Sequence, residues 1–136
     1  MSHRPEIAQA FRPLHDAVMG PGTLEPRLKT LAYLAASYAN ESPFDVAQYT
    51  ARAREEGFSD DEIHAVRMEQ NLDFTPHESA ALKIARELTR TCTVDDIDSN
   101  ILDLFTSPQM VELVSVIALA NFDNRFTNAL DVEQKP

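Results

Sequence analysis

The sequence predicts an all-α protein, a single-domain bundle of about six to seven helices. Only three glycines occur among its 136 residues, and the β-branched residues are scattered among alanine, leucine, glutamate and arginine, a mixture that favours helix over strand. Apolar residues recur at spacings of three and four, as one face of a helix requires. With 43% hydrophobic residues the chain can bury one continuous core, so we expect one domain over 1–136.

Apolar stripes, bounded by proline and glycine, predict the first two helices. The first covers residues 5–18, with isoleucine, phenylalanine, leucine and valine on one face, and it ends at the Gly-Pro-Gly turn over 20–22. The second covers 26–40, with leucine, alanine and tyrosine down one face. Its alanine-rich turns allow neighbouring helices to approach closely.

Three motifs of the form Ser/Thr-x-x-acid predict the starts of the next helices, because such a pair can cap a helix N-terminus. Gly57 is placed to end the first of these helices. A further short helix is expected after Thr93. The motifs and their helices are 42–45 before 43–56, 59–62 before 60–70, and 75–78 before a helix to about residue 90.

The last predicted helix runs from Pro108 to about Leu130. Because it is apolar almost all round over 111–120, we expect it at the centre of the bundle or in a subunit interface. The string Asn-Phe-Asp-Asn-Arg-Phe over 121–126 then places four polar side chains directly after that apolar stretch. Each needs a partner or a solvent-filled pocket, so this string points to a site.

Composition excludes several classes of partner and site. With 22 acidic and 12 basic residues the formal charge is -10, so we expect neither nucleic acid nor an anionic membrane as partner. The sequence contains no run of about 18 apolar residues, which is the length that a helix needs to span a bilayer. The one cysteine, Cys92, cannot form an internal disulfide, and His15, His64 and His77 lack metal-ligand spacing. We therefore expect a cytoplasmic protein without a metal.

Three segments carry a family resemblance that covers most of the chain. They are LEPRLKTL at 24–31, ARAREEGFSDDEI at 51–63 and IALANFDNRFTNAL at 117–130. Together they resemble the carboxymuconolactone decarboxylase family and its alkyl hydroperoxidase D-like members. The resemblance implies an alkyl hydroperoxidase D-like fold, assembly as a homo-trimer or hexamer and, for the decarboxylase branch, catalysis without metal or organic cofactor.

The peroxidase branch of this family carries a glutamate followed by a Cys-x-x-Cys-x-x-x-His motif, which form a dithiol and proton relay. By the resemblance, the four positions are occupied here by Thr30, Ser42, Asp45 and Tyr49. A dithiol peroxidase needs a reactive thiolate and a resolving thiol, and neither a hydroxyl nor a carboxylate can replace them. We therefore predict that the chain has no dithiol peroxidase activity.

The decarboxylase branch, by the same resemblance, has a glutamate at the position of Asp45 and a histidine at that of Tyr49. Asp45 keeps the carboxylate, whereas a tyrosine with a pKa of about 10 donates a hydrogen bond better than it accepts a proton. Both lie on one helix face, and Ser42 stands at the start of that helix, so the three can share one pocket. Alternatively, Ser42 and Asp45 only cap the helix, and Tyr49 is a core residue bonded to a carbonyl.

The functional hypothesis is a cofactor-free decarboxylase or lyase-type enzyme acting on a small carboxylic acid. Asp45 and Tyr49 are the predicted catalytic residues, and Arg125 is predicted to hold a substrate carboxylate through a bidentate contact. The predicted substrate-binding residues are Ser42, Thr30, Asn121 and Arg125. Alternatively, the chain is a non-catalytic or small-molecule-binding family member that lost the redox relay, with the polar groups of 121–125 joined in a salt-bridge network.

Overall fold

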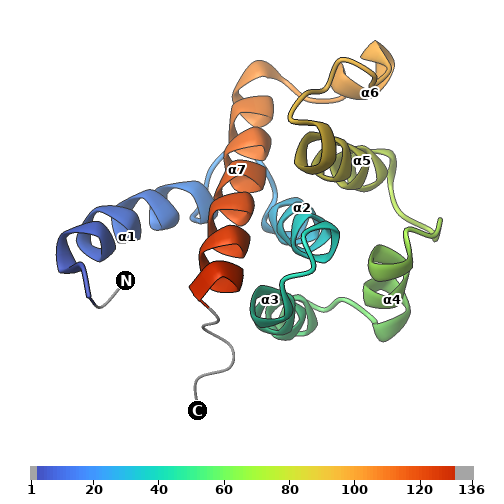
Figure 1. Ribbon diagram of the computed structural model, residues 1–136. Helices are drawn as coiled ribbons and strands as arrows, with labels where there is room; N and C mark the ends of the chain where they lie inside the picture. The colour runs from blue at the N-terminus through green and yellow to red at the C-terminus, as the bar shows by residue number, and fades with distance from the viewer. Residues whose placement is uncertain (1–2, 131–136) are drawn as a thin grey trace.

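The computed structural model describes residues 3–130, and these form seven helices, so the predicted all-α class is confirmed (Figure 1). The helix ends agree with the sequence predictions to within a few residues. Within the described residues no helix has both the length and the apolar composition needed to cross a membrane. The helices are α1 (Pro5–Met19), α2 (Pro26–Ala39), α3 (Pro43–Glu55), α4 (Asp60–Met68), α5 (Pro76–Thr91), α6 (Ser99–Leu102) and α7 (Ser107–Leu130).

α2, and not α7, is the central helix of the bundle. Every side chain from Leu28 to Ser37 is buried, because α3, α4, α5 and α7 pack around α2 (Figure 1). The leucines of the predicted apolar face are buried, and so are polar residues on the other faces of α2, namely Lys29, Thr30 and Ser37. In α7 one side packs against α2 and α5, while Val111 and Val114 on the other side are exposed. Of the two predicted positions of α7, the centre of the bundle is therefore wrong, and the subunit interface stays a prediction.

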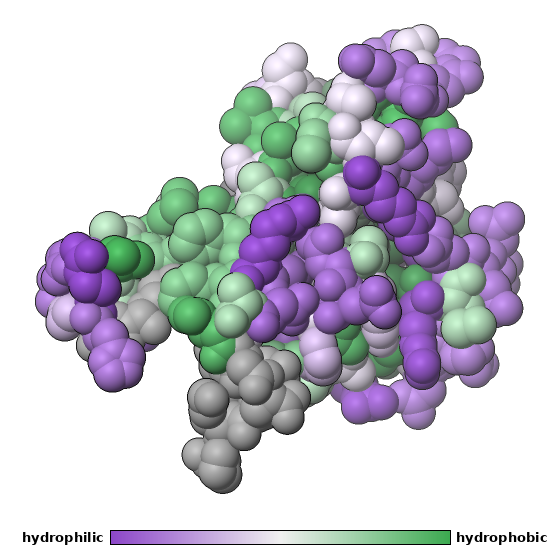
Figure 2. Space-filling view, viewed as in Figure 1, coloured by the Kyte–Doolittle hydropathy of each residue, from purple (hydrophilic) through white to green (hydrophobic). Residues whose placement is uncertain are grey.

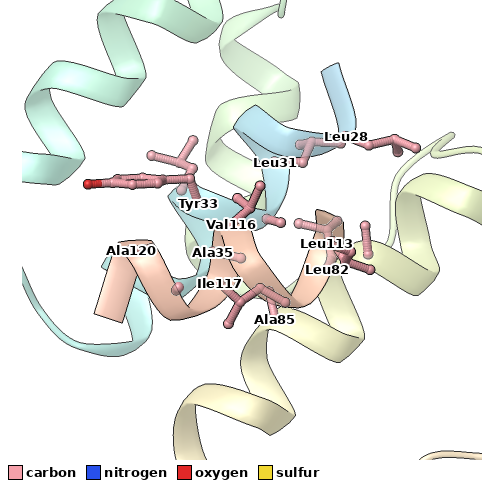
Figure 3. Packing of buried hydrophobic residues seen from close by; sticks show 14 of the residues in the cluster. Leu28, Leu31, Tyr33, Ala35, Leu82, Ala85, Leu113, Val116, Ile117 and Ala120 are labelled. Carbon is pink, nitrogen blue, oxygen red and sulfur yellow. The ribbon is translucent and has the colours of Figure 1, made fainter. Parts of the chain in front are cut away.

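The core forms where α2, α5 and α7 meet. Leu31 of α2, Ile84 of α5 and Ile117 of α7 have almost no exposed surface, and Figure 3 shows aliphatic side chains of the same three helices interdigitating. Burying one such side chain stabilises the fold by about 1.5–3 kcal/mol. Alanines on α2 and α5 leave room for this close packing.

Two of the three predicted capping boxes are confirmed. Ser59 and Glu62 cap α4 reciprocally, and Thr75 with Glu78 does the same for α5. The third is wrong, because Ser42 accepts no hydrogen bond from a backbone N–H at the start of α3. Gly57 follows α3 with a φ of +94°, a left-handed conformation that favours glycine and confirms the predicted helix end.

α1 lies apart from the rest of the bundle and packs mainly on α7 (Figure 1). Phe11 stacks on Phe122 with ring centroids 5.1 Å apart. Val18 also packs against the core, but Ile7 and Leu14 are 41% and 55% exposed. The expectation that this stripe faces the core is thus wrong for half of its residues.

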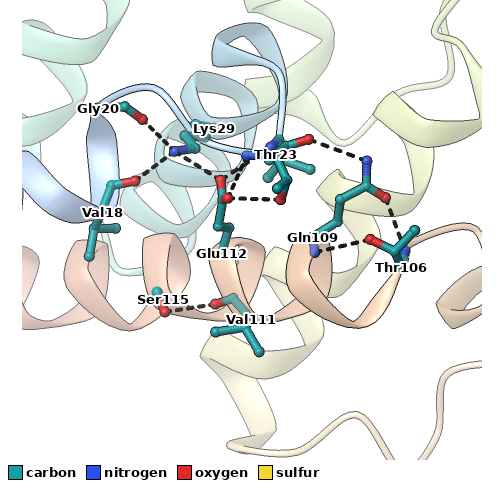
Figure 4. Close-up of polar contacts among 10 residues, drawn as sticks. Val18, Gly20, Thr23, Lys29, Thr106, Gln109, Val111, Glu112 and Ser115 are labelled. Carbon is teal, nitrogen blue, oxygen red and sulfur yellow. Dashed lines mark hydrogen bonds and ion pairs between the residues drawn. The ribbon is translucent and has the colours of Figure 1, made fainter.

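A buried lysine fixes the loop between α1 and α2 (Figure 4). Lys29 is 1% exposed, and its Nζ donates to the carbonyl oxygens of Val18 and Gly20 at 2.8 and 2.7 Å and lies 3.2 Å from Oε2 of Glu112. Glu112 in turn accepts from the backbone N–H of Thr23 at 2.5 Å. The backbone N–H of Thr23, with further donors that include Lys29, lowers the pKa of Glu112 to about 2.

This arrangement predicts that Glu112→Gln lowers the free energy of unfolding by about 2–3 kcal/mol at neutral pH, because it leaves a buried ammonium without its countercharge. A carboxyl whose pKa falls from about 4.3 in the unfolded chain to about 2 in the folded one stabilises the fold above its unfolded pKa and loses this effect as the pH falls. Denaturant titrations should therefore show the difference from wild type shrinking between about pH 5 and pH 2.

Glu25→Gln is the matched control, since Glu25 is exposed and its side chain does not cap α2. It should leave the unfolding free energy unchanged within about 0.5 kcal/mol. An equal effect of both substitutions, or a Glu112→Gln effect that does not vary with pH, would contradict the assigned role of Glu112.

Candidate functional site

A pocket of about 470 Å³ lies among α1, α2, α3 and α7. Its volume is in the usual range for small-molecule sites, about 300–1,000 Å³. Two of the predicted site residues, Asp45 and Tyr49, line it together. The lining is formed by five aromatic residues (Phe11, Tyr33, Phe44, Tyr49, Phe126), two carboxylates (Asp45, Asp123) and His15, Gln48, Arg52 and Thr127.

Asp45 lies on the first turn of α3 and is 4% exposed. Its Oδ2 accepts hydrogen bonds from Ser42 Oγ at 2.9 Å, Asn124 Nδ2 at 2.9 Å and Thr127 Oγ1 at 3.0 Å. Its Oδ1 accepts no hydrogen bond from the residues that the structure describes. One oxygen is thus anchored, and the other is available to a ligand in the pocket.

Two tyrosines stack beside this carboxylate. The rings of Tyr33 from α2 and Tyr49 from α3 are 3.6 Å apart at their centroids, with an interplanar angle of 14°. The Tyr33 hydroxyl donates to Oδ2 of Asp123, whereas the Tyr49 hydroxyl makes no hydrogen bond to a protein acceptor within residues 3–130. Burial raises the pKa of Tyr49 to about 12 and that of Tyr33 further, so both are neutral hydrogen-bond donors at neutral pH.

Asp123 is the second carboxylate of the pocket. Burial raises the pKa of its carboxyl, the Tyr33 hydrogen bond opposes this, and the nearby negative charge of Asp45 raises the pKa further. His15 of α1 faces the same pocket. Two acids in different environments are the usual basis for an acid and base pair.

Arg52 provides a positive charge at the pocket. It stands one turn after Tyr49 on α3, and its guanidinium lies 5.5 Å from the centroid of the Tyr49 ring. Its hydrogen bond to Glu56 is long, at 3.4 Å, and its charge opposes the rise in the pKa of Tyr49. Its Nη atoms donate to no protein acceptor within residues 3–130 and can bind a ligand.

Ser42 and Thr30 support the site from outside the pocket. Ser42 is fully buried behind Asp45 and donates to it, so it positions the carboxylate and does not face the cavity. Thr30 donates to Oε1 of Glu56 at 2.6 Å and joins α2 to the end of α3. Neither hydroxyl lines the cavity that contains Asp45 and Tyr49.

Asn121 and Arg125 line a different groove, between α5 and α7. Arg125 Nη1 donates to Oδ1 of Asn121 at 2.5 Å, and Asn121 also bonds Asn40 and Thr89. The exposed Cys92 lies along the same groove. The structure therefore does not bring Arg125 together with Asp45 and Tyr49, which the predicted carboxylate contact requires.

Several residues that line the pocket were not predicted as site residues from the sequence. Arg52 had a usable signal, because it follows Asp45 by seven residues and Tyr49 by three and so shares their helix face. Tyr33 had none, since it comes from a helix far apart in the sequence from α3, whereas Asp123 belongs to the polar string over 121–126 that was predicted to mark a site. Within residues 3–130, no three His, Cys, Asp or Glu side chains are grouped so that they could hold a metal ion.

Comparisons with known proteins agree with this fold. The model of the carboxymuconolactone decarboxylase family matches residues 5–87. A protein of unknown function from Agrobacterium tumefaciens, proposed to be the antioxidant defence protein AhpD, aligns with a TM-score of 0.86 and 25% identity over 97% of this chain and 92% of its own. No curated protein matches the chain.

Two further solved structures are similar. An uncharacterised peroxidase-related protein from Ralstonia eutropha JMP134, described as an alkylhydroperoxidase AhpD core, has a TM-score of 0.83 and 25% identity over 93% of this chain and 70% of its own. The debrominase Bmp8, solved with 2,3,4-tribromopyrrole, has a TM-score of 0.85 and 22% identity over 96% of this chain and 72% of its own. The alkyl hydroperoxidase D-like fold predicted from the sequence is thus confirmed.

The stacked tyrosines provide a matched test of the site geometry. Tyr33→Phe removes a hydroxyl that donates to a carboxylate and should lower the unfolding free energy by about 1–3 kcal/mol. Tyr49→Phe removes a hydroxyl without a protein acceptor and should change the unfolding free energy by less than about 0.5 kcal/mol. Chemical denaturation measures both, and equal costs would contradict the assigned hydroxyl partners.

Proposed function

Because the chain belongs to the carboxymuconolactone decarboxylase family, we propose that it is a cofactor-free decarboxylase or lyase-type enzyme acting on a small carboxylic acid. The observation that carries this proposal is the pairing of Asp45 and Tyr49 in one pocket. Asp45 has one anchored and one free carboxylate oxygen, and the Tyr49 hydroxyl donates to no protein acceptor within residues 3–130. Reactive groups left unpaired in a pocket are available to a ligand.

The proposed reaction breaks the bond between the acid's α-carbon and its carboxylate. CO₂ leaves, and the electron pair passes into an adjacent carbonyl group as an enolate. Tyr49 donates a hydrogen bond to the enolate oxygen, where negative charge develops. Oδ1 of Asp45 takes up a proton from solvent and passes it to the α-carbon, so that the carboxylate is restored at the end of the reaction.

Arg52, and not the predicted Arg125, binds the acid group of the substrate. It lines the same pocket as Asp45 and Tyr49, whereas Arg125 lies in the groove between α5 and α7. A guanidinium with free donors can bind a carboxylate through two parallel hydrogen bonds.

The proposal excludes dithiol peroxidase chemistry. The sequence has one cysteine, Cys92, and it is exposed at the C-terminal end of α5, away from the pocket of Asp45. A single free thiol cannot form and resolve an internal disulfide. One free cysteine also suits a reducing compartment, so we place the protein in the cytoplasm.

We expect Asp45→Asn to abolish CO₂ release from the acid that serves as substrate, because an amide cannot deliver the proton. Arg52→Gln should raise KM by about tenfold with a smaller effect on kcat, since it weakens binding of the acid group. CO₂ release from a panel of 3-oxo acids and unsaturated lactone acids measures both effects.

Arg125→Gln is the matched control and should leave these constants unchanged. Binding of an acid without turnover by any panel member would instead support a small-molecule-binding family member. Turnover of an organic hydroperoxide with a thiol reductant, lost in Cys92→Ser, would overturn the proposal.

We further propose that copies of the chain assemble through α1 and α7 as a homo-trimer or hexamer, as the family resemblance implies. Figure 2 shows apolar surface continuing from α1 onto α7. Val111 is 66% exposed on α7, and Ile7 and Leu14 are open on α1. Contiguous exposed apolar surface of this kind usually marks an interaction site.

Val111→Lys combined with Val114→Lys should therefore convert the assembly to a single 15.2 kDa chain, as measured by light scattering after size-exclusion chromatography. Met68→Lys is the control, because Met68 is 51% exposed but lies on α4, away from this surface. A wild-type mass of one chain would refute the assembly.

A further inference from the structure

The wall of the Asp45 pocket is largely aromatic. Five of the ten aromatic residues in the sequence line this one pocket, and they come from four different helices. Phe11 and Phe126 belong to a stacked series that also includes Phe122, while Tyr33 and Tyr49 form a parallel pair. Flat aromatic walls pack best against a flat ring, through offset-stacked or edge-to-face contacts.

The charges of the pocket limit the ligand further. Arg52 is the one arginine that lines the pocket, and two carboxylates, Asp45 and Asp123, line it as well. A ligand with two carboxylates would place one of them near these acids, which is unfavourable. One arginine and two acidic side chains therefore favour a ligand with a single carboxylate and with a group that donates a hydrogen bond.

We propose that this pocket takes a planar aromatic monocarboxylic acid that carries a hydroxyl group, such as a hydroxybenzoate. The inference rests on the proposed function, because it names the substrate class of the same site. In such a ring Asp45 passes a proton to the carbon that bears the carboxylate while Asp123 takes the hydroxyl proton. The bond to CO₂ then breaks with its electron pair passing through the ring to that oxygen, and Asp123 returns the proton to give a phenol. Arg52 binds the carboxylate, and the ring lies against the aromatic wall. The ligand hydroxyl donates to Asp123, whose Oδ2 is occupied by Tyr33 and whose Oδ1 accepts no hydrogen bond within residues 3–130.

Isothermal titration calorimetry with 4-hydroxybenzoate, benzoate and cyclohexanecarboxylate tests this assignment. We expect 4-hydroxybenzoate to bind wild type most tightly, with benzoate weaker by about threefold to tenfold for the lost hydrogen bond. Cyclohexanecarboxylate should bind more weakly than benzoate by about threefold or more, because a puckered ring loses the stacking contacts. Equal affinities for the saturated and aromatic acids would overturn the proposal.

Two variants locate the ligand's polar groups. Arg52→Gln should weaken binding of 4-hydroxybenzoate by about tenfold, and Asp123→Asn should reduce the preference for 4-hydroxybenzoate over benzoate, since a neutral amide oxygen accepts more weakly than a carboxylate. Arg54→Gln is the control, because Arg54 is exposed on the same helix and bonds Asp60. An equal loss in Arg52→Gln and Arg54→Gln would contradict the assigned carboxylate contact.

Binding and turnover separate this inference from the proposed function. If 4-hydroxybenzoate binds through Arg52 but neither it nor any panel acid releases CO₂, the ligand class stands and the enzymatic proposal fails. If an aliphatic acid is decarboxylated through Asp45 and 4-hydroxybenzoate does not bind, the enzymatic proposal stands and the ligand class is wrong.

Discussion

The site depends on the buried carboxylate of Asp45, which joins α3 to α7. A buried charge is costly unless hydrogen bonds compensate it, and here three donors converge on one oxygen. Two of them, Asn124 and Thr127, come from α7, so the contact fixes α7 relative to α3. That register also determines where Asp123, the residue before Asn124, meets the pocket.

The helices were largely predictable from sequence because their ends obey local rules, such as the Ser59 and Thr75 capping boxes and the left-handed Gly57. The central position of α2 was not predictable. Its buried Lys29 looks like a surface residue in the sequence, and it can be buried only because Glu112, 83 residues later, supplies its countercharge. A local pattern contains no information about such a partner.

The candidate site was predictable to the extent that one helix carries it. Asp45 and Tyr49 share a face of α3, and the structure places them in one pocket. The polar string of α7 was treated as one cluster, but residues two apart on a helix are about 200° apart around its axis. Asp123 therefore faces the pocket, while Arg125 faces the groove beside α5.

The chemistry of the site follows from the side chains at the start of α3, where the family resemblance places two redox cysteines. A spacing of three residues on a helix brings either pair of side chains into contact, and here Ser42 and Asp45 are hydrogen-bonded at 2.9 Å. Two thiols in this geometry can exchange electrons with a substrate, whereas a hydroxyl and a carboxylate can only exchange protons or bind donors. The same backbone geometry can thus support a different class of reaction, which is why the fold alone does not identify the function.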